Sequence, residues 1–499
     1  MKKIVKIVLI FFAVIFNHSC SESFIDLPYE NGTVDVNFFQ TPLHAEQAVT
    51  GIYGVLTNQQ LFSWYGLAMG SDPSDEVVEL HGDPGWTQWT ELDQYTYTPV
   101  NNFIGGHWEV LYQGIHRANS VITKVPGIEG LDPTLGKRYL AEAKALRALF
   151  YYHVVISWGD APLYLEPITL EISKKATRTP ASEIWAQIIK DLEEAKVDLP
   201  DTYPAAQIAR VTKGFANGLL SRVYLWTKEY SKAAQAAQAV VSSPFGYKLE
   251  TNYKDLYDGT VENGKEILLD VQNVTGRAGE SKWNSGESTS FNRVWYWFSN
   301  QSWAIFFEPA RSFINNMFEP GDVRKKASIL DTDAGETYDM NNDGKIDIKD
   351  AIPKSPTGAH IIKGIPPKVD LTLVSNYNTG LVQWVNVHVM RYSEILLNFA
   401  DALNEQGQGS QALPYINQVR VRAKLPNLTT TNQVELRNAI LHERAVEFCF
   451  EGMRFFDLKR AGKLQEVCGP LGFVAGKHEV FPIPQSEIDL TEMEQNPNY

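Results

Sequence analysis

The sequence predicts a mainly α-helical fold, in which about four tetratricopeptide-like helical hairpins form a scaffold that long loop-rich insertions interrupt. In most segments apolar residues recur every three to four positions, which is the period of an amphipathic helix. Residues 62–106 and 270–390 lack that period and are rich in Gly, Asn, Ser, Asp and aromatic residues. With 499 residues and 44% hydrophobic content, the chain can bury a sizeable core.

Residues 1–19 are typical of a secretory signal peptide. Three lysines precede an apolar run over residues 7–16, which is too short to span a bilayer. The junction "FNHSC" places Ser19 directly before Cys20, as in a bacterial lipoprotein signal, although Asn17 stands where leucine is usual. We therefore predict that Cys20 becomes a lipidated amino terminus. Plain secretion with an incidental cysteine is the alternative.

The clearest helix lies in "TRTPASEIWAQIIKDLEEAKVDLP". Thr179 can cap its N-terminus, Pro180 suits the first helical position, and Pro200 stops it. One apolar stripe runs along this helix through Ile184, Ile188, Leu192, Ala195 and Leu199.

Two segments have the spacing of a helical hairpin, in which small alanines let the two helices approach closely. The first is "GLLSRVYLWTKEYSKAAQAAQAVV", which breaks around residues 228–230 and carries Tyr224, Ala233, Ala237 and Val240. The second is "EILLNFADALNEQGQGSQALPYINQVRVRA", which carries Ala400, Leu403, Ala412, Ile416 and Val419. Two further pairs are less regular. One pairs "ALRALFYYHVVISW" with the helix that follows Pro180, and the other lies within "ELRNAILHERAVEFCFEGMRFFDLKRAG". The pairs are not in tandem, so we expect an interrupted, solenoid-like scaffold.

The stretch "DMNNDGKIDIKD" has the spacing of a twelve-residue calcium loop. Its ligands would be Asp339, Asn341, Asp343, the carbonyl of Lys345, Asp347 and Asp350, with Gly344 at the sharp turn. Gly335 precedes the loop, and Pro353 and Pro356 follow it, so the two long helices of a calcium sensor are not expected. We predict a structural Ca²⁺ site that orders a surface insertion, and an acidic surface turn is the alternative.

The charge of the chain disfavours two classes of partner. The net charge is −14, and it becomes −17 without the three signal-peptide lysines, with 42 basic against 59 acidic residues. Nucleic acids and anionic membranes would be repelled by this surface. Neutral ligands and proteins are therefore the better candidates.

The sequence gives only weak evidence for catalytic sites. The sequence has no nucleophile elbow, no phosphate-binding glycine loop and no complete zinc-protease motif. The charged residues of "ERAVEFCFEGMRFFDLKR" fall at helical spacing and predict a structural ion-pair network. Cys449 and Cys468 could pair in an oxidising compartment, or Cys449 could simply be a small buried residue.

Six segments over nearly the whole chain keep the order of one known family: "YLAEAKALRALFYYHVVISWGDAPL", "TPASEIWAQIIKDLEEAKVDLP", "ARVTKGFANGLLSRVYLWTKEYSKAAQAA", "RYSEILLNFADALNEQG" with "YINQVRVRA", "HERAVEFCFEGMRFFDLKRAGKL" and "FPIPQSEIDLTEMEQNPNY". Together they resemble the SusD/RagB family of outer-membrane nutrient-uptake lipoproteins of Bacteroidota. The resemblance implies tetratricopeptide-like pairs on one side and a loop-rich ligand-binding face on the other. Residues 20–260 would form an N-terminal helical region and 261–499 a C-terminal region, packed as one globular unit.

The resemblance also implies a function. Such a protein would sit on the outside of the outer membrane through its lipid, bind a glycan or another nutrient, and pass it to a SusC-like, TonB-dependent transporter. It would have no catalysis of its own. The alternatives are a structural lid of the transporter that does not touch glycan, and a secreted glycoside hydrolase.

Seven of the 12 tryptophans lie in two windows of the insertions, at residues 64–89 and 283–303. Indole rings stack on the apolar C–H faces of sugars, while amides and carboxylates bind the hydroxyls. The candidate ligand contacts are Trp86, Trp89, Trp283, Trp295 and Trp297, with Asp75, Asn284 and Arg293 as polar partners. The alternation in "VWYWFSN" also permits a buried strand face for Trp295 and Trp297.

Overall fold

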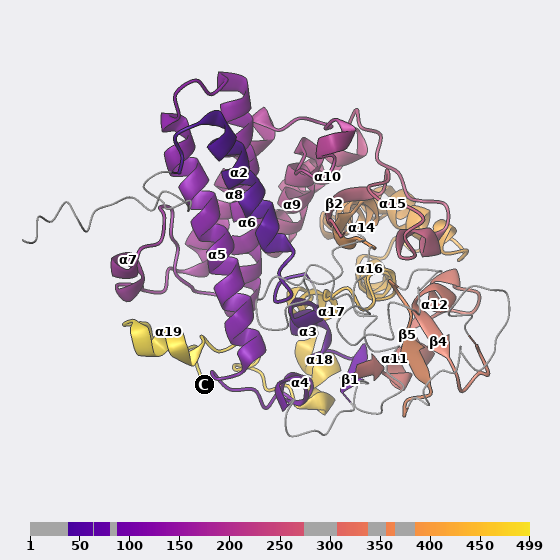
Figure 1. The fold of residues 1–499 in the computed structure, drawn as a ribbon. Helices are drawn as coiled ribbons and strands as arrows, with labels where there is room; N and C mark the ends of the chain where they lie inside the picture. The colour runs from indigo at the N-terminus through magenta and orange to yellow at the C-terminus, as the bar shows by residue number, and fades with distance from the viewer. Residues whose placement is uncertain (1–37, 63, 80–86, 274–306, 338–355, 365–384) are drawn as a thin grey trace, which may run out of the picture.

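The computed structural model describes residues 38–62, 64–79, 87–273, 307–337, 356–364 and 385–499. These ranges are mainly helical, so the predicted fold class is confirmed. Figure 1 shows long helices α2, α5, α6 and α8 side by side, followed by α9, α10 and α14, with short helices and strands beyond them.

The helices of the described ranges vary from five to 26 residues. They are α2 (Pro42–Leu56), α3 (Trp64–Ser71), α4 (Thr87–Asp93), α5 (Asn102–Lys124), α6 (Pro133–Trp158), α7 (Leu170–Lys174), α8 (Ala181–Asp198), α9 (Lys213–Trp226), α10 (Tyr230–Val241), α11 (Arg311–Met317), α12 (Val323–Ser328), α14 (Tyr392–Glu405), α15 (Gly409–Arg422), α16 (Gln433–Glu447), α17 (Arg454–Arg460), α18 (Leu464–Cys468) and α19 (Gln485–Leu490). None of these helices combines the length and low polarity needed to cross a bilayer.

Helices α2, α5 and α6 each start at a side chain that caps free backbone N–H groups. Asp132 precedes α6 and accepts a hydrogen bond from the backbone N–H of Leu135 at 2.8 Å. The same helix ends at Gly159, whose φ of +72° is a conformation that favours glycine. At α8 the cap position is Pro180, which has no side-chain hydrogen bond, so the predicted Thr179 cap is wrong.

Three predicted helix pairs are present. Helix α9 ends three residues before α10 begins, and the two helices pack together, as do α14 with α15 and α6 with α8. Helix α10 also packs on α14, which joins two pairs into one scaffold. In the fourth pair α17 is short, because the chain after α16 turns sharply at Phe450 (φ +62°) and Gly452 (φ +73°). We call α5, α6, α8, α9, α10, α14, α15 and α16 the helical scaffold.

Buried ion pairs join neighbouring helices of the scaffold. Arg147 on α6 contacts Asp191 on α8 at 2.7 Å, with two parallel hydrogen bonds. Arg222 on α9 contacts Glu394 on α14 in the same manner, at 2.5 and 2.6 Å. Such planar, bidentate pairs fix orientation as well as distance. The ion-pair network predicted for "ERAVEFCFEGMRFFDLKR" is present too, but its pairs join different elements: Glu447 contacts Arg391 and Arg422, and Arg444 on α16 contacts Asp457 on α17.

Three small antiparallel sheets of two strands each complete the described structure. They pair β1 (Val77–Glu79) with β3 (Phe307–Pro309), β2 (Ile267–Val271) with β6 (Val387–Arg391), and β4 (Ile329–Asp331) with β5 (Ala359–Ile361).

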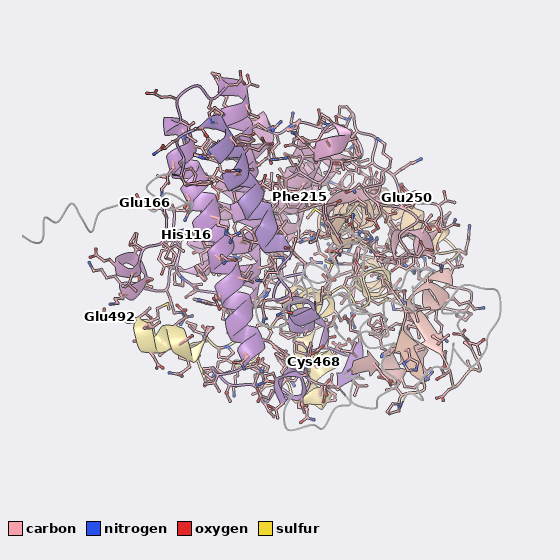
Figure 2. The ribbon with its side chains drawn as sticks, viewed as in Figure 1. His116, Glu166, Phe215, Glu250, Cys468 and Glu492 are labelled. Carbon is pink, nitrogen blue, oxygen red and sulfur yellow. The ribbon has the colours of Figure 1, made fainter. Side chains whose placement is uncertain are left out.

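Cys449 and Cys468 are both buried, and neither forms a disulfide. The possible pairing of these cysteines is therefore wrong, and the interpretation of Cys449 as a small buried residue is confirmed. Figure 2 labels Cys468, the last residue of α18, which packs on α17. One hydrophobic cluster contains residues from Ala45 to Met493 and fills the spaces between the helices.

Candidate functional site

The pairing of β1 with β3 joins the ends of the two tryptophan-rich insertions. Val77 lies opposite Pro309, Val78 opposite Glu308, and the last residue of β1 opposite the first residue of β3. Residues 80–86 follow β1 directly, and residues 274–306 precede β3 directly. Two segments that lie about 200 positions apart in the sequence are thus attached to the fold at the same end of one strand pair.

The segment that carries the predicted calcium loop is hydrogen-bonded to the same strand pair, through β3. Strands β4 and β5 form its base, and Glu308 on β3 accepts hydrogen bonds from Thr357 through the backbone N–H at 3.0 Å and Oγ1 at 2.7 Å. Arg311 donates to the carbonyl oxygen of Thr357 at 2.8 Å and contacts Asp331 on β4 at 2.9 Å. We call β1, β3, β4 and β5 together the strand frame. The three segments with predicted ligand or calcium residues, 80–86, 274–306 and 338–355, all attach to it.

Trp89 is a core residue and not a ligand contact. Its side chain is completely buried and meets Phe103 edge to face, with ring centroids 4.4 Å apart. The reason is the amphipathic character of α4, in which Trp89 and Leu92 are three positions apart and share the buried face. The prediction for Trp89 is wrong, and this spacing was the signal that could have excluded it.

Asp75 lies at the base of β1, but its carboxylate is engaged by the protein. Both oxygens accept hydrogen bonds from Arg454, at 2.7 Å from Nε and 2.9 Å from Nη2. The Asp75 side chain keeps 19% of its surface exposed. A direct ligand contact by Asp75 remains a prediction, while its contact with α17 is a feature that no local sequence pattern indicated.

The other predicted site residues lie outside the described residues and stay predictions. For the ligand these are Trp86, Trp283, Asn284, Arg293, Trp295 and Trp297; for the lipid, Cys20; and for calcium, Asp339, Asn341, Asp343, Lys345, Asp347 and Asp350. Within the part of the chain that the structure describes, no group of three or more His, Cys, Asp or Glu side chains is placed to hold a metal ion.

A carboxyl pair that sequence reasoning missed lies at the edge of the strand frame. Burial raises the pKa of Asp93 to about 7, and the nearby charge of Glu79 adds to this shift. Glu79 is the last residue of β1, and its Oε2 accepts a hydrogen bond from Thr90 Oγ1 at 2.7 Å. One carboxyl at this edge therefore titrates near neutral pH. No spacing in the sequence brings Asp93 and Glu79 together.

A hollow with both polar and apolar walls lies among α3, α6, α9, β6, α14 and α17, with about 930 Å³ of empty space when its part open to solvent is included. Its wall includes Arg222, Arg444 and Asp457. Arg222 is paired with Glu394, and Arg444 contacts Asp457 at 2.9 Å. The arginines of this wall are thus neutralised by carboxylates, so it offers no strong attraction to a charged ligand.

Comparison with known proteins identifies the family. A family model described as "Starch-binding associating with outer membrane" matches residues 44–225, and the "SusD family" model matches residues 308–473. The chain belongs to the SusD family. The two matches cover most of the scaffold and most of the described strand frame, so the SusD resemblance found in the sequence is confirmed.

Curated relatives align over most of the SusD-like chain. SusD-like protein P2 of Formosa agariphila is 29% identical over 93% of this chain and 94% of its own length. The starch-binding protein SusD of Bacteroides thetaiotaomicron is 27% identical over 74% of each chain. Among solved structures, a laminarin-binding SusD-like protein aligns with a TM-score of 0.79 and 29% identity, over 92% of this chain and all of that one.

Proposed function

We propose that this protein is a surface lipoprotein that binds an oligosaccharide or polysaccharide and delivers it to a partner TonB-dependent transporter in the outer membrane. The observation that carries the proposal is the match to a laminarin-binding SusD-like protein, at 29% identity over 92% of the chain. The family description, which names starch binding and the outer membrane, supports the same class of ligand and place.

The arrangement of the strand frame supports a single ligand-binding face. Both tryptophan-rich insertions attach at one end of the β1–β3 pair. Several indole rings gathered at one place would suit an extended glycan, which presents a series of apolar sugar faces. The protein's net charge of −14 is compatible with a neutral glycan and unfavourable for an anionic one.

Calorimetry with laminarin as the first probe, followed by a glycan array, tests the binding step. We expect the protein without its signal peptide to bind, and the triple variant Trp86→Ala, Trp283→Ala, Trp295→Ala to bind at least about tenfold more weakly. Trp185→Ala changes a half-buried indole of α8 in the scaffold and is the control, with unchanged affinity. If no glycan on the array binds, the proposal is wrong.

Two further measurements separate the alternatives. A glycoside hydrolase would release reducing ends from the bound polysaccharide, and we expect none. A structural lid would co-purify with the transporter from detergent-extracted membranes but bind no glycan. The proposal requires both glycan binding and co-purification, and the absence of a transporter would remove the delivery step.

The proposed anchor is the lipid on Cys20. We expect Cys20→Ala to shift protein from the outer-membrane fraction toward the soluble fraction, because the lipid is the proposed anchor and only the contact with the transporter would remain. Radiolabelled fatty acid should enter the wild-type protein and not the variant. Labelling of both proteins, or of neither, would contradict the assignment of Cys20.

We also propose that residues 339–350 bind a structural Ca²⁺. The support is the ligand spacing in the sequence, together with the β4–β5 pair that closes the base of this segment. We expect calcium binding with a Kd of roughly 0.1–1 mM, as in extracellular modules. Calorimetry should lose the calcium heat in Asp343→Ala, and Asp333→Ala, a carboxylate outside the twelve-residue loop, should retain it.

A further inference from the structure

The segment "EGMRFFDLKR", residues 451–460, contacts six different parts of the fold through its polar side chains. Glu451 accepts hydrogen bonds from Lys363 and Arg391, Arg454 donates to Asp75, Asp457 pairs with Arg444, Lys459 donates to the carbonyl of Ile156, and Arg460 pairs with Asp401. Four of these contacts reach the scaffold or β6, and the contact of Glu451 with Lys363 reaches the residues just after β5. The contact of Arg454 alone reaches the loop that leads into the strand frame.

The pair of Arg454 with Asp75 is buried and directional. Arg454 is only 4% exposed, and its two hydrogen bonds to Asp75 are parallel, at 2.7 and 2.9 Å. A bidentate contact of this kind fixes the angle between its partners as well as their separation. The two residues are 379 positions apart, so the pair spans almost the whole protein in sequence.

Two more contacts place the same loop against the same segment. The backbone N–H of Phe450 donates to Glu76 at 3.1 Å. Gly70 approaches Gly452 so closely that a Cβ on Gly70 would lie 1.8 Å from the Gly452 carbonyl oxygen. These contacts fix the position of the end of α3, and of the loop after it, relative to the turn that precedes α17.

The loop after α3 leads directly into β1, so its position determines where the strand frame begins. Asp75 and Glu76 immediately precede β1, and the carbonyl oxygen of Glu76 accepts a hydrogen bond from the backbone N–H of Ala310, next to β3. Because β1 and β3 have only three residues each, no long ladder fixes their position. The contacts at the base of β1 therefore add a constraint that the short ladder does not provide.

We infer that Arg454 is a positioning residue: through Asp75 it sets where the β1–β3 pair, and with it the proposed ligand-binding face, lies relative to the helical scaffold. Arg454 acts through Asp75 and β1 and does not touch the glycan. This inference rests on the proposed function for its ligand readout, while its structural part stands independently.

The rest of α17 is held without Arg454. Asp457 and Arg460 keep their ion pairs to α16 and α14, and Phe455 and Leu458 are buried in the core. Loss of the Arg454 side chain should therefore leave the scaffold folded and release mainly the base of β1. This separation makes the inference testable.

Hydrogen–deuterium exchange tests the structural part without any ligand. In Arg454→Met we expect peptides covering residues 72–79 and 307–312 to exchange at least about tenfold faster, because truncating one partner of a buried pair removes a strong local constraint. Peptides covering residues 213–226 of the scaffold should not change. Arg454→Lys should give an intermediate rate, since an ammonium group cannot make the bidentate contact.

Arg437→Met is the control for loss of a bidentate pair elsewhere in the fold, because Arg437, whose side chain is 41% exposed, makes such a pair with Glu405 inside the scaffold, at 2.5 and 2.8 Å. It should leave exchange at residues 72–79 unchanged. Unchanged exchange at this peptide in Arg454→Met would overturn the inference, and so would an equal acceleration in every peptide.

Laminarin calorimetry tests the consequence for binding. We expect Arg454→Met to weaken laminarin binding about tenfold and Arg437→Met to leave it unchanged. Faster exchange with unchanged laminarin affinity would overturn the link to the ligand face. If the wild-type protein bound no glycan at all, the proposed function would fail, and the exchange measurement would still decide the role of Arg454.

Discussion

The helical scaffold and the strand frame are stabilised in different ways. The scaffold consists of helices of 12 to 26 residues that pack along apolar stripes, with internal ion pairs that refine their orientation. The frame consists of four strands of three residues each, and polar contacts between distant segments hold it in place. In this protein the proposed binding insertions attach to the part whose position depends on a few specific contacts. The predictions below test whether one region can be destabilised without the other.

The largest expected effect is at the close contact between α3 and the turn before α17. In Gly70→Ala the new methyl group would lie 1.8 Å from a backbone oxygen that cannot rotate away. We expect a loss of at least about 3 kcal/mol in the free energy of unfolding, because the backbone must move. Urea denaturation followed by circular dichroism measures this value.

Gly51→Ala is the matched control for Gly70→Ala. Gly51 lies in α2, and a Cβ there would meet nothing within 4 Å. Replacing a helical glycine by alanine should stabilise the protein by about 0.5–1 kcal/mol. If both variants were destabilised equally, the loss would come from helical geometry in general and not from the junction between scaffold and frame.

The second prediction concerns the buried carboxylate of Glu451. Burial alone would raise the pKa of this carboxyl, but the charges of Arg391 and Lys363 outweigh burial and lower the pKa to about 2. Glu451→Gln keeps the shape of the side chain but removes the charge, and we expect it to cost about 2 kcal/mol at pH 7.

The contribution of Glu451 should also be visible in the pH dependence of the free energy of unfolding. In the unfolded chain Glu451 should titrate near its ordinary pKa of about 4.3. The stabilisation is therefore complete above that value and is lost as the pH falls toward 2. As the pH is lowered from 6 to 2.5, the midpoint temperature of thermal unfolding should decrease less steeply for Glu451→Gln than for the wild-type protein. Identical slopes would show that Glu451 does not carry this dependence.

The scaffold could be predicted from the sequence because its signals are local. The boundaries of α9 and α10 follow from a break at residues 228–230, and the helix after Pro180 follows from its stripe and from Pro200. Each of these signals lies within about one helix length of the element that it determines. The family resemblance rested on the same segments.

The strand frame could not be predicted, because its contacts join distant residues. Nothing near Asp75 indicates Arg454, and no three-residue strand has a pattern long enough to specify its partner. Composition alone placed Trp89 in the ligand site, although its spacing from Leu92 placed it in the core. The error came from giving the chemistry of a residue type more weight than its position on a helix.

A third, smaller effect is expected inside the strand frame. Arg311→Met removes the contacts to the Thr357 carbonyl oxygen and to Asp331, and we expect a cost of about 1 kcal/mol because Arg311 is partly exposed. Hydrogen exchange should accelerate at residues 356–361 more than at residues 72–79. Equal acceleration of both peptides would mean that the frame opens as one unit, in which case the separate fastening of β4 and β5 has no consequence.

The smallest effect is expected on the surface of the scaffold, and it provides the baseline for the other three. Lys144 on α6 contacts Glu194 on α8 at 2.7 Å, between the same two helices that the buried pair of Arg147 and Asp191 joins, but the Glu194 side chain is 43% exposed. Solvent screens such a pair and long side chains lose entropy in it, so Glu194→Gln should change the free energy of unfolding by less than about 0.5 kcal/mol. Urea denaturation at low and high salt measures this difference. A cost near that of Glu451→Gln would mean that exposure does not separate the two kinds of ion pair, and burial could then not explain the larger effect expected at Glu451.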